Sequence, residues 1–223
     1  MRLTERLRFV ACITLLCVLA GCQGPHARPK ITPAAPTETP LSPAAQSAEA
    51  SRPTRIGNAP DDIHGVDWAN IAIDGAFCDV PGLVRLRPHA RSALSTTHGQ
   101  VQIGSYDKPV YGDVSGDRGD EVAVSVACDN GGGTASGQLG FAYAIYAKRG
   151  RDLMLLGTVT SQHNPPRTHV TLLSKLRLGR GRITVRELWY RSSDGTCCPT
   201  GEALTRWTVR HDVLTPHPPE ILR

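Results

Sequence analysis

Hydrophobic and polar residues alternate along several stretches of the chain. The clearest stretch is 120–128, DEVAVSVAC, in which Val122, Val124, Val126 and Cys128 occupy one face and small residues occupy the other. A period of two with β-branched residues is typical of a β-strand, because successive side chains of a strand point to opposite faces. We therefore expect a strand over 120–128.

Two further stretches have the pattern of β-hairpins. Residues 141–159 contain two apolar segments around a turn at Gly150, and residues 169–190 contain two around a turn at Gly179 and Gly181. Glycine in these turns supplies the positive φ that tight hairpins require. Four other segments are further strand candidates: 70–73, 83–86, 100–103 and 203–209.

The connections between these predicted strands are short. Short connections favour antiparallel pairing, since parallel strands need long crossovers. The sequence therefore predicts a mainly β fold, a single antiparallel domain of hairpins or a meander with about eight to ten strands. The alternative is a small α+β domain, for which residues 89–95 provide a candidate short helix without a clear cap.

The first 22 residues follow a different pattern. Three arginines precede an apolar run over 9–20, which is shorter than the stretch of about 20 apolar residues that a membrane-spanning helix needs. The run ends in Leu-Ala-Gly-Cys, which resembles the lipobox of bacterial lipoproteins. This resemblance implies that the signal peptide, residues 1–21, is removed and that Cys22 carries a diacylglyceryl group. We then expect a lipid anchor on the outer face of the bacterial cytoplasmic membrane; the alternatives are a plain signal peptide and a short buried helix.

Residues 22–60 have the composition of a tether. Eight of the 17 prolines lie between Gln23 and Pro60, among Ala, Ser and Thr. Proline removes amide donors and the segment has few large apolar residues, so it does not bury enough surface to offset the entropy of ordering. We expect a disordered tether at 22–60 and one globular β domain at 61–223.

The net charge of the chain is mild. The full sequence carries 25 Lys and Arg against 20 Asp and Glu, and removal of residues 1–21 leaves 22 against 19, a net charge of +3. The arginines are scattered along the sequence, without the basic stripe and aromatic platforms that are typical of nucleic-acid-binding proteins. We therefore expect no nucleic-acid partner.

The predicted location makes the cysteines interpretable. Two of the seven leave with the signal peptide and Cys22 is acylated, so four remain: Cys78, Cys128, Cys197 and Cys198. An even number in an exported protein indicates disulfides. Neighbouring Cα atoms lie about 3.8 Å apart, closer than the about 5.5–6 Å of ordinary disulfides. We therefore favour two bridges that join Cys78 and Cys128 to Cys197 and Cys198, in either order. A zinc site of these cysteines with nearby histidines is the alternative.

The acidic stretch 113–121, DVSGDRGDE, is the candidate for metal chemistry. Alternating carboxylates in a glycine-containing loop can converge on a hard cation such as Ca²⁺. The stretch resembles the DxDGDGxxD loops of integrin-type surface repeats, although Arg118 stands at a glycine position. The resemblance implies a structural Ca²⁺ site with four ligands: Asp113, Ser115, Asp117 and Glu121. The alternative is a solvated turn that leads into the strand over 120–128.

Three stretches together are similar to a group of exported lipoproteins common in actinomycetes. They are VYGDVSGDRGDEVAVSVAC at 110–128, NGGGTASGQL at 130–139 and DGTCCPTG at 194–201. In that group, NGGGTAxGQL and DGTCCPxG segments follow a lipobox and a Pro/Ala-rich tether in the same order. The resemblance covers about residues 60–215 and implies the architecture and the location. It transfers no catalytic role.

The sequence lacks two local motifs of the common hydrolases. GxSxG and HExxH are both missing from it, and the histidines are dispersed. We therefore expect a non-catalytic binding or structural module whose partner is a protein, a cell-wall component or a small molecule. Trp189, Tyr190 and Trp207 are expected in its core.

The alternative function is a cell-wall-directed hydrolase. In that case distant carboxylates, such as those of Asp117 and Glu187, converge in a cleft. A concave pocket of carboxylates or histidines would favour the enzyme, whereas a flat surface with an apolar patch would favour the binding module.

Overall fold

The computed structural model describes residues 52–87, 91–132, 137–165 and 169–223. All of them belong to one unit, 45–223. The predicted signal peptide, Cys22 and most of the predicted tether lie outside the described residues. None of the described helices is long and apolar enough to cross a membrane.

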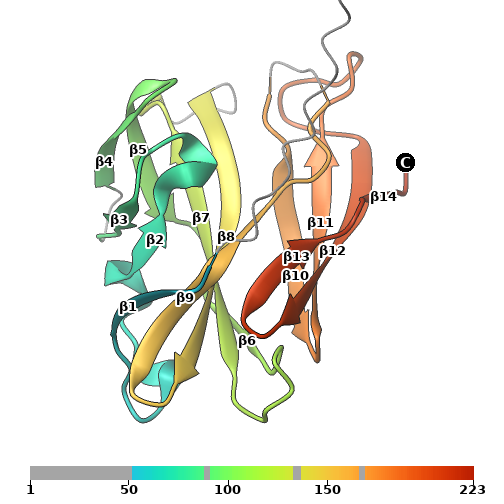
Figure 1. Ribbon diagram of the computed structural model, residues 1–223. Helices are drawn as coiled ribbons and strands as arrows, with labels where there is room; N and C mark the ends of the chain where they lie inside the picture. Colours follow the sequence, from blue (N-terminus) through green and yellow to red (C-terminus); the bar gives the residue numbers. More distant parts are fainter. Residues whose placement is uncertain (1–51, 88–90, 133–136, 166–168) are drawn as a thin grey trace, which may run out of the picture. The chain divides into compact units, whose positions relative to one another are not determined.

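The larger of the two main sheets contains seven antiparallel strands and lies on the left in Figure 1. Its spatial order is β4 (Arg91–Ser95), β5 (Gly99–Ser105), β7 (Glu121–Asp129), β8 (Gln138–Arg149), β9 (Asp152–Thr160) and β1 (Thr54–Asn58), with β6 (Val110–Gly112) also paired to β7. The longest strands, β7 to β9, form its centre. The hairpin predicted over 141–159 is β8–β9 and is confirmed.

The second main sheet contains five antiparallel strands and lies on the right in Figure 1. Its order is β10 (Leu172–Gly179), β11 (Arg182–Trp189), β12 (Gly201–Arg210) and β13 (Val213–Pro216), and β14 (Glu220–Ile221) also pairs with β12. The hairpin predicted over 169–190 is β10–β11, and the strand predicted over 203–209 is β12. Both predictions are confirmed.

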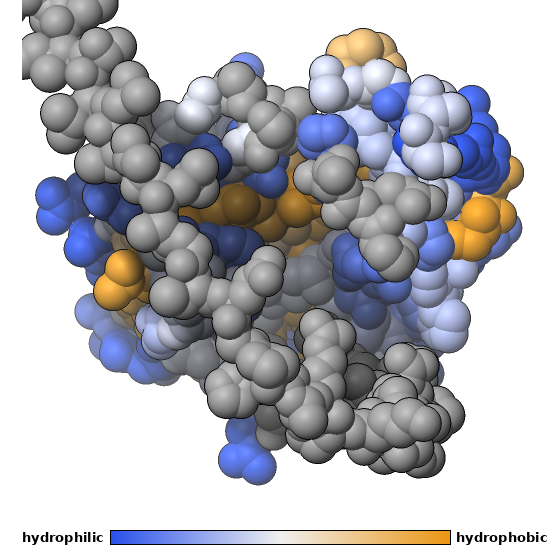
Figure 2. All heavy atoms as spheres, turned by 90° about the horizontal axis from the view of Figure 1, so that it is seen from above, coloured by the Kyte–Doolittle hydropathy of each residue, from blue (hydrophilic) through white to orange (hydrophobic). Residues whose placement is uncertain are grey.

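A thin third layer packs on the seven-stranded sheet. It consists of a two-stranded sheet and three 3-10 helices: β2 (Ala72–Asp74), β3 (Leu83–Arg85), η1 (Ile63–Gly65), η2 (Trp68–Asn70) and η3 (Gly75–Cys78). Seen from above, hydrophilic side chains surround a recess in which apolar residues are visible (Figure 2).

Strand β7 contacts both of the other layers, one with each of its faces. Its face of Val122, Val124 and Val126 packs in one core with the third layer. The opposite face carries Ala123, which packs in a second core with the five-stranded sheet, for example with Ile183. The small residues of this face therefore lie at a buried layer boundary, where the second sheet replaces solvent.

The domain begins earlier than predicted. Residues Thr54–Asn58, assigned to the tether, form β1 and pair with β9. Pro53 and Pro60 flank this strand and give its surroundings a tether-like composition. Ile56 packs against the first core, and this contact is what joins the segment to the domain.

The candidate helix over 89–95 is wrong for its described part. Residues Arg91–Ser95 form β4, an edge strand paired with β5. Most of its side chains are exposed, so the strand has no apolar alternation for the sequence to reveal. The described residues contain fourteen strands, more than the predicted number, because strands of two to five residues such as β6 and β14 carry little periodicity.

The disulfide pairing also differs from the favoured prediction. Cys78 pairs with Cys128, with Cα atoms 6.2 Å apart, and Cys197 pairs with its neighbour Cys198. The physical reason is location: Cys78 and Cys128 are both buried in the first core, whereas Cys197 and Cys198 are exposed in the loop after β11. With all four cysteines bridged, the alternative zinc site has no thiolate ligand.

Candidate functional site

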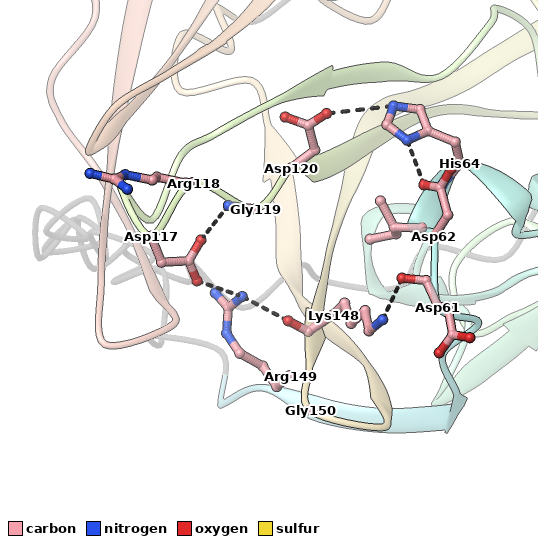
Figure 3. A pocket seen from close by; sticks show the side chains of 11 residues that line it. Asp61, Asp62, His64, Asp117, Arg118, Gly119, Asp120, Lys148, Arg149 and Gly150 are labelled. Atoms are coloured by element: carbon pink, nitrogen blue, oxygen red, sulfur yellow. Dashed lines mark hydrogen bonds and ion pairs between the residues drawn. The ribbon is translucent and has the colours of Figure 1, made fainter.

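A polar pocket lies where three distant segments meet (Figure 3). Residues 61–64, 117–120 and 148–150 line a cavity of about 450 Å³. The first segment enters η1, the second belongs to the acidic loop before β7, and the third forms the turn between β8 and β9. Charged side chains of both signs and one histidine line it: Asp61, Asp62, Asp117, Asp120, Arg118, Lys148, Arg149 and His64.

His64 lies between two carboxylates in this pocket. Its Nδ1 is 2.8 Å from Asp62 Oδ1, and its Nε2 is 3.5 Å from Asp120 Oδ2. Asp62 is the N-cap of η1 and also accepts a hydrogen bond from the His64 backbone N–H, at 2.9 Å. Capping therefore fixes the histidine and its first carboxylate together, because short polar side chains satisfy the free amides of a helix start.

The Asp62 carboxyl is ionised at neutral pH. The hydrogen bond from the His64 backbone N–H, followed by that from its side chain, lowers the pKa of Asp62 from the ordinary value of 3.8. The side chain is largely exposed, so this carboxylate keeps its contact with water. An ionised and hydrated carboxylate is suited to binding a cation or a hydrogen-bond donor.

An aromatic column supports the histidine from below. The His64 ring stacks on Tyr111, with ring centroids 4.1 Å apart. Tyr111 in turn accepts a hydrogen bond from Trp68 Nε1, at 2.9 Å, and Trp68 packs on Tyr146. Tyr146 is buried, which raises the pKa of its hydroxyl, and it donates to the Ala72 carbonyl oxygen. These contacts connect the His64 ring to the first core.

Arg149 is a partly buried cation at the other side of the pocket. Its guanidinium donates to both carboxylate oxygens of Asp212, to Glu121 Oε1 at 3.1 Å and to the Lys148 carbonyl oxygen. Asp117 Oδ2 lies 3.6 Å away. These contacts, those with Asp212 first, raise the pKa of Arg149 above its ordinary value. Planar guanidinium groups suit such multiple carboxylate contacts.

Glu121 organises the acidic loop from inside. Its side chain is fully buried, and its Oε2 accepts from the backbone N–H groups of Val114 and Ser115 at 2.7 and 2.9 Å. The Ser115 hydroxyl donates to Oε1 at 2.6 Å. Arg149 supplies the counter-charge. The carboxylate therefore clamps the loop onto the start of β7.

The four predicted calcium ligands do not gather around one point. Asp113 accepts from the N–H groups of Gly116 and Arg118, and Asp117 accepts from the Gly119 N–H. Arg149 is the cation that faces Glu121 and Asp117. Across the part of the chain that the structure describes, no group of three or more His, Cys, Asp or Glu is arranged to hold a metal ion. The geometry is that of the alternative, an Asp/Gly turn held by its own amides.

The hydrolase pair of Asp117 and Glu187 does not converge either. Glu187 is fully buried on β11, where it accepts from the backbone N–H groups of Gln162 and His163 at 2.9 and 2.8 Å and from the Thr205 hydroxyl. It does not line the polar pocket, whereas Asp117 does. The three aromatic residues predicted for the core, Trp189, Tyr190 and Trp207, are buried, and that prediction is confirmed.

The DGTCCPTG segment forms a loop with its own internal support. Asp194 accepts from the N–H groups of Arg191 and Thr200, at 2.7 and 2.8 Å, and from the Thr200 hydroxyl. Gly201 at its end lies opposite Trp189, and a Cβ there would overlap the indole ring. The glycine is therefore required by packing, and the loop lies outside the polar pocket.

Sequence reasoning missed the pocket because its residues are far apart in the chain. His64 was one of several dispersed histidines, and Arg149 was only part of a hairpin turn. The one local signal is Asp62-Ile63-His64, since an aspartate two residues before a histidine can cap the backbone and hold the ring. Comparison of the chain with protein-family models, with curated proteins and with solved structures gave no match.

Proposed function

We propose that this chain is a lipid-anchored module of the outer face of the bacterial cytoplasmic membrane, and that it binds a polar cell-wall fragment in the pocket around His64. The observation that carries the binding function is the pocket itself. Three segments present fixed carboxylates near His64 and a lysine on the facing side. A muropeptide carries carboxylate, amine and hydroxyl groups, so both signs of charge in the pocket have a complement.

Two groups in the pocket have capacity left for a ligand. Asp62 uses Oδ1 for His64, and no other hydrogen bond within the described ranges involves its Oδ2. Lys148 donates to the Asp61 carbonyl oxygen, which leaves two of its three ammonium hydrogens for other acceptors. Arg149, in contrast, is satisfied by protein oxygens and supports the wall of the pocket.

Binding without turnover fits this geometry better than catalysis. A glycosidase needs a carboxylic acid whose pKa is raised by burial so that it can donate a proton. Asp62 is exposed and its pKa is lowered, so it is a poor proton donor at neutral pH. The His64 side chain is also half exposed, and water therefore reaches the site.

The binding function can be tested by isothermal titration calorimetry with soluble muropeptides. The protein is the full chain with Cys22→Ser, which leaves the pocket intact. We expect a saturable heat that falls at least tenfold in affinity with His64→Ala and stays unchanged with His98→Ala, a matched histidine outside the pocket. Equal affinities in the two variants, or no heat with any muropeptide, would contradict the proposal.

A second candidate is the cell-wall-directed hydrolase, with His64 as general base. The specific observation in its favour is the Asp62–His64 contact, because a carboxylate on Nδ1 orients a catalytic imidazole. Release of soluble fragments from dye-labelled cell wall would support this candidate if His64→Ala abolished it. Binding of muropeptides without any release at pH 5–9 would support the binding module.

The anchor rests on the Leu-Ala-Gly-Cys sequence and the tether that follows it. Membrane fractionation of cells that produce Cys22→Ser should find the protein in the soluble or secreted fraction, because the acyl chains are lost. Cys17→Ser, which retains Cys22, is the control and should stay with the membrane. Retention of the Cys22→Ser protein in the membrane would contradict lipidation at this residue.

A further inference from the structure

The arginines that are scattered in sequence gather on one face of the five-stranded sheet. In β11, Ile183, Val185 and Glu187 point to the buried side, so the alternating residues point away from the second core. The register of β10–β11 and β11–β12 extends this outer face to the neighbouring strands. Five arginines occupy it: Arg177, Arg182, Arg186, Arg206 and Arg210. We call this surface the arginine face.

Acidic partners neutralise only part of the arginine face. Glu202 pairs with Arg186 and with Arg223, and Glu220 pairs with Arg206 at 2.9 Å. The other three arginines, Arg177, Arg182 and Arg210, make no ion pair with any described residue, and all three are exposed. The face therefore presents uncompensated positive charge.

Arg182 is the centre of this charge. It lies directly opposite Thr208, so its diagonal neighbours on β12 are Arg206 and Arg210. On the other side, Arg177 lies opposite Thr184 and is thus also diagonal to Arg182. Diagonal side chains are about 7–8 Å apart at Cα and within reach of long side chains, so these like charges repel one another. An anionic surface would relieve that repulsion.

Apolar side chains adjoin the same face. Leu222, which follows β14 and donates its backbone N–H to the Glu202 carbonyl oxygen at 2.8 Å, is 45% exposed although it is a large hydrophobic residue. Leu204, partly exposed, lies between Arg206 and Glu202 on β12 and opposite Arg186. Arginines next to exposed apolar residues match a lipid interface, where phosphates lie above acyl chains. A soluble polyanion has no acyl chains with which the apolar residues could pack.

We propose that the arginine face docks on an anionic phospholipid surface. Guanidinium groups form bidentate hydrogen bonds with phosphate oxygens. The attraction of basic residues to an anionic leaflet falls off within a Debye length. The face would hold the domain against the membrane independently of any acyl anchor at Cys22. The polar pocket takes no part in this contact, because none of its lining residues belongs to the five-stranded sheet.

Vesicle flotation tests the proposal. The protein is the full chain with Cys22→Ser, and the vesicles contain either 30% phosphatidylglycerol in phosphatidylcholine or phosphatidylcholine alone. We expect at least tenfold tighter binding to the anionic vesicles and a further tenfold or greater loss on raising the salt from 50 to 300 mM. Equal binding to both kinds of vesicle would overturn the proposal.

Matched variants separate the arginine face from the overall charge. The first triple variant replaces the three unpaired arginines of the face with glutamine: Arg177→Gln, Arg182→Gln and Arg210→Gln. It should bind anionic vesicles at least tenfold more weakly. The control triple variant removes the same charge from exposed residues elsewhere: Arg87→Gln, Arg91→Gln and Arg151→Gln. It should keep more than half of the binding. Equal losses in the two triple variants would overturn the proposal. So would binding to polyphosphate as tight as to the vesicles, since a soluble polyanion would then account for the face.

Discussion

Two fully buried glutamates, one in each main sheet, are stabilised by different sets of hydrogen-bond and charge partners. Glu121 at the start of β7 and Glu187 in β11 each accept two backbone N–H groups from a neighbouring loop and one side-chain hydroxyl. Among the residues that the structure describes, Glu121 has a guanidinium partner, Arg149, and Glu187 has none. Each carboxylate therefore clamps a loop, but only the first is linked by charge to the polar pocket.

Glu187 stabilises the fold alone, whereas Glu121 also supports the polar pocket. The loop held by Glu187 lies at 161–163 and is not part of the pocket, whereas the loop held by Glu121 continues into Asp117 and Asp120. Arg149 joins that loop to the β8–β9 turn. The ion pair between the buried Glu121 and the partly exposed Arg149 thus joins two of the three segments that line the pocket.

Removal of the glutamates should have the largest effects. Glu121→Ala leaves two amides and the Ser115 hydroxyl without their acceptor and removes one carboxylate from Arg149, and we expect a loss of about 4–5 kcal/mol in the free energy of unfolding. Glu187→Ala leaves two amides and a hydroxyl, and we expect about 3 kcal/mol. Urea denaturation with an unchanged m-value measures both. A larger loss for Glu187→Ala would show that the ion pair does not distinguish the two clamps.

Replacement of the cation should affect one clamp alone. We expect Arg149→Met to cost about 2–3 kcal/mol, less than a fully buried pair because the guanidinium is partly exposed. In a double-mutant cycle, Arg149→Met and Glu121→Gln should couple by about 1–3 kcal/mol. The same arginine change with Glu187→Gln should add without coupling. Coupling of equal size in both cycles would contradict the separation of the two clamps.

Loss of the hydroxyl partners should have smaller and comparable effects. Ser115→Ala and Thr205→Val each remove one donor to a buried carboxylate, and we expect about 1 kcal/mol for each. The measurement is the same urea denaturation. An effect below 0.3 kcal/mol in either variant would show that its hydroxyl contributes little to the clamp.

Asp62, an exposed carboxylate, makes the same kind of hydrogen bond with a backbone N–H, and we expect its contribution to stability to be the smallest. Asp62 also accepts a backbone N–H, and this lowers the pKa of its carboxyl below 3.8. A lowered folded-state pKa favours the folded state above pH 3.8, and this contribution is lost as the pH falls through the lower value. We expect the side-chain carboxyl carbon resonance of Asp62 to titrate in an NMR experiment with its main midpoint below pH 3.8. A shift centred above pH 4.5 would contradict the hydrogen bond.

The sequence predicted the strands in which apolar and polar residues alternate over many positions. It did not predict strands that are short, exposed or flanked by prolines. The valines of β7 and the glycine turns of both hairpins gave the antiparallel fold. Residues 54–58 were missed because prolines flank them, and 91–95 because an exposed edge strand carries no apolar pattern. Disulfide pairing depended on which cysteines are buried in the first core and which lie in an exposed loop, and the strand pattern does not contain that information.

The candidate site was partly visible in the sequence. The acidic stretch 113–121 does contribute two carboxylates to the pocket, but its predicted metal role depended on spacing alone. The cation that faces Glu121 and Asp117 comes from Arg149, which is 28 residues away from Glu121. Such a partner becomes evident only when strand pairing brings the β8–β9 turn beside the loop before β7.

An NMR titration of the isotope-labelled full chain with Cys22→Ser tests the central claim most directly. Soluble muropeptides are added while the backbone amide resonances are followed. The account predicts saturable shifts confined to residues 61–64, 117–120 and 148–150, which line the pocket. It also predicts that these shifts disappear with His64→Ala. Shifts centred instead on the loop at 194–201, or no saturable shift at any residue, would contradict the account.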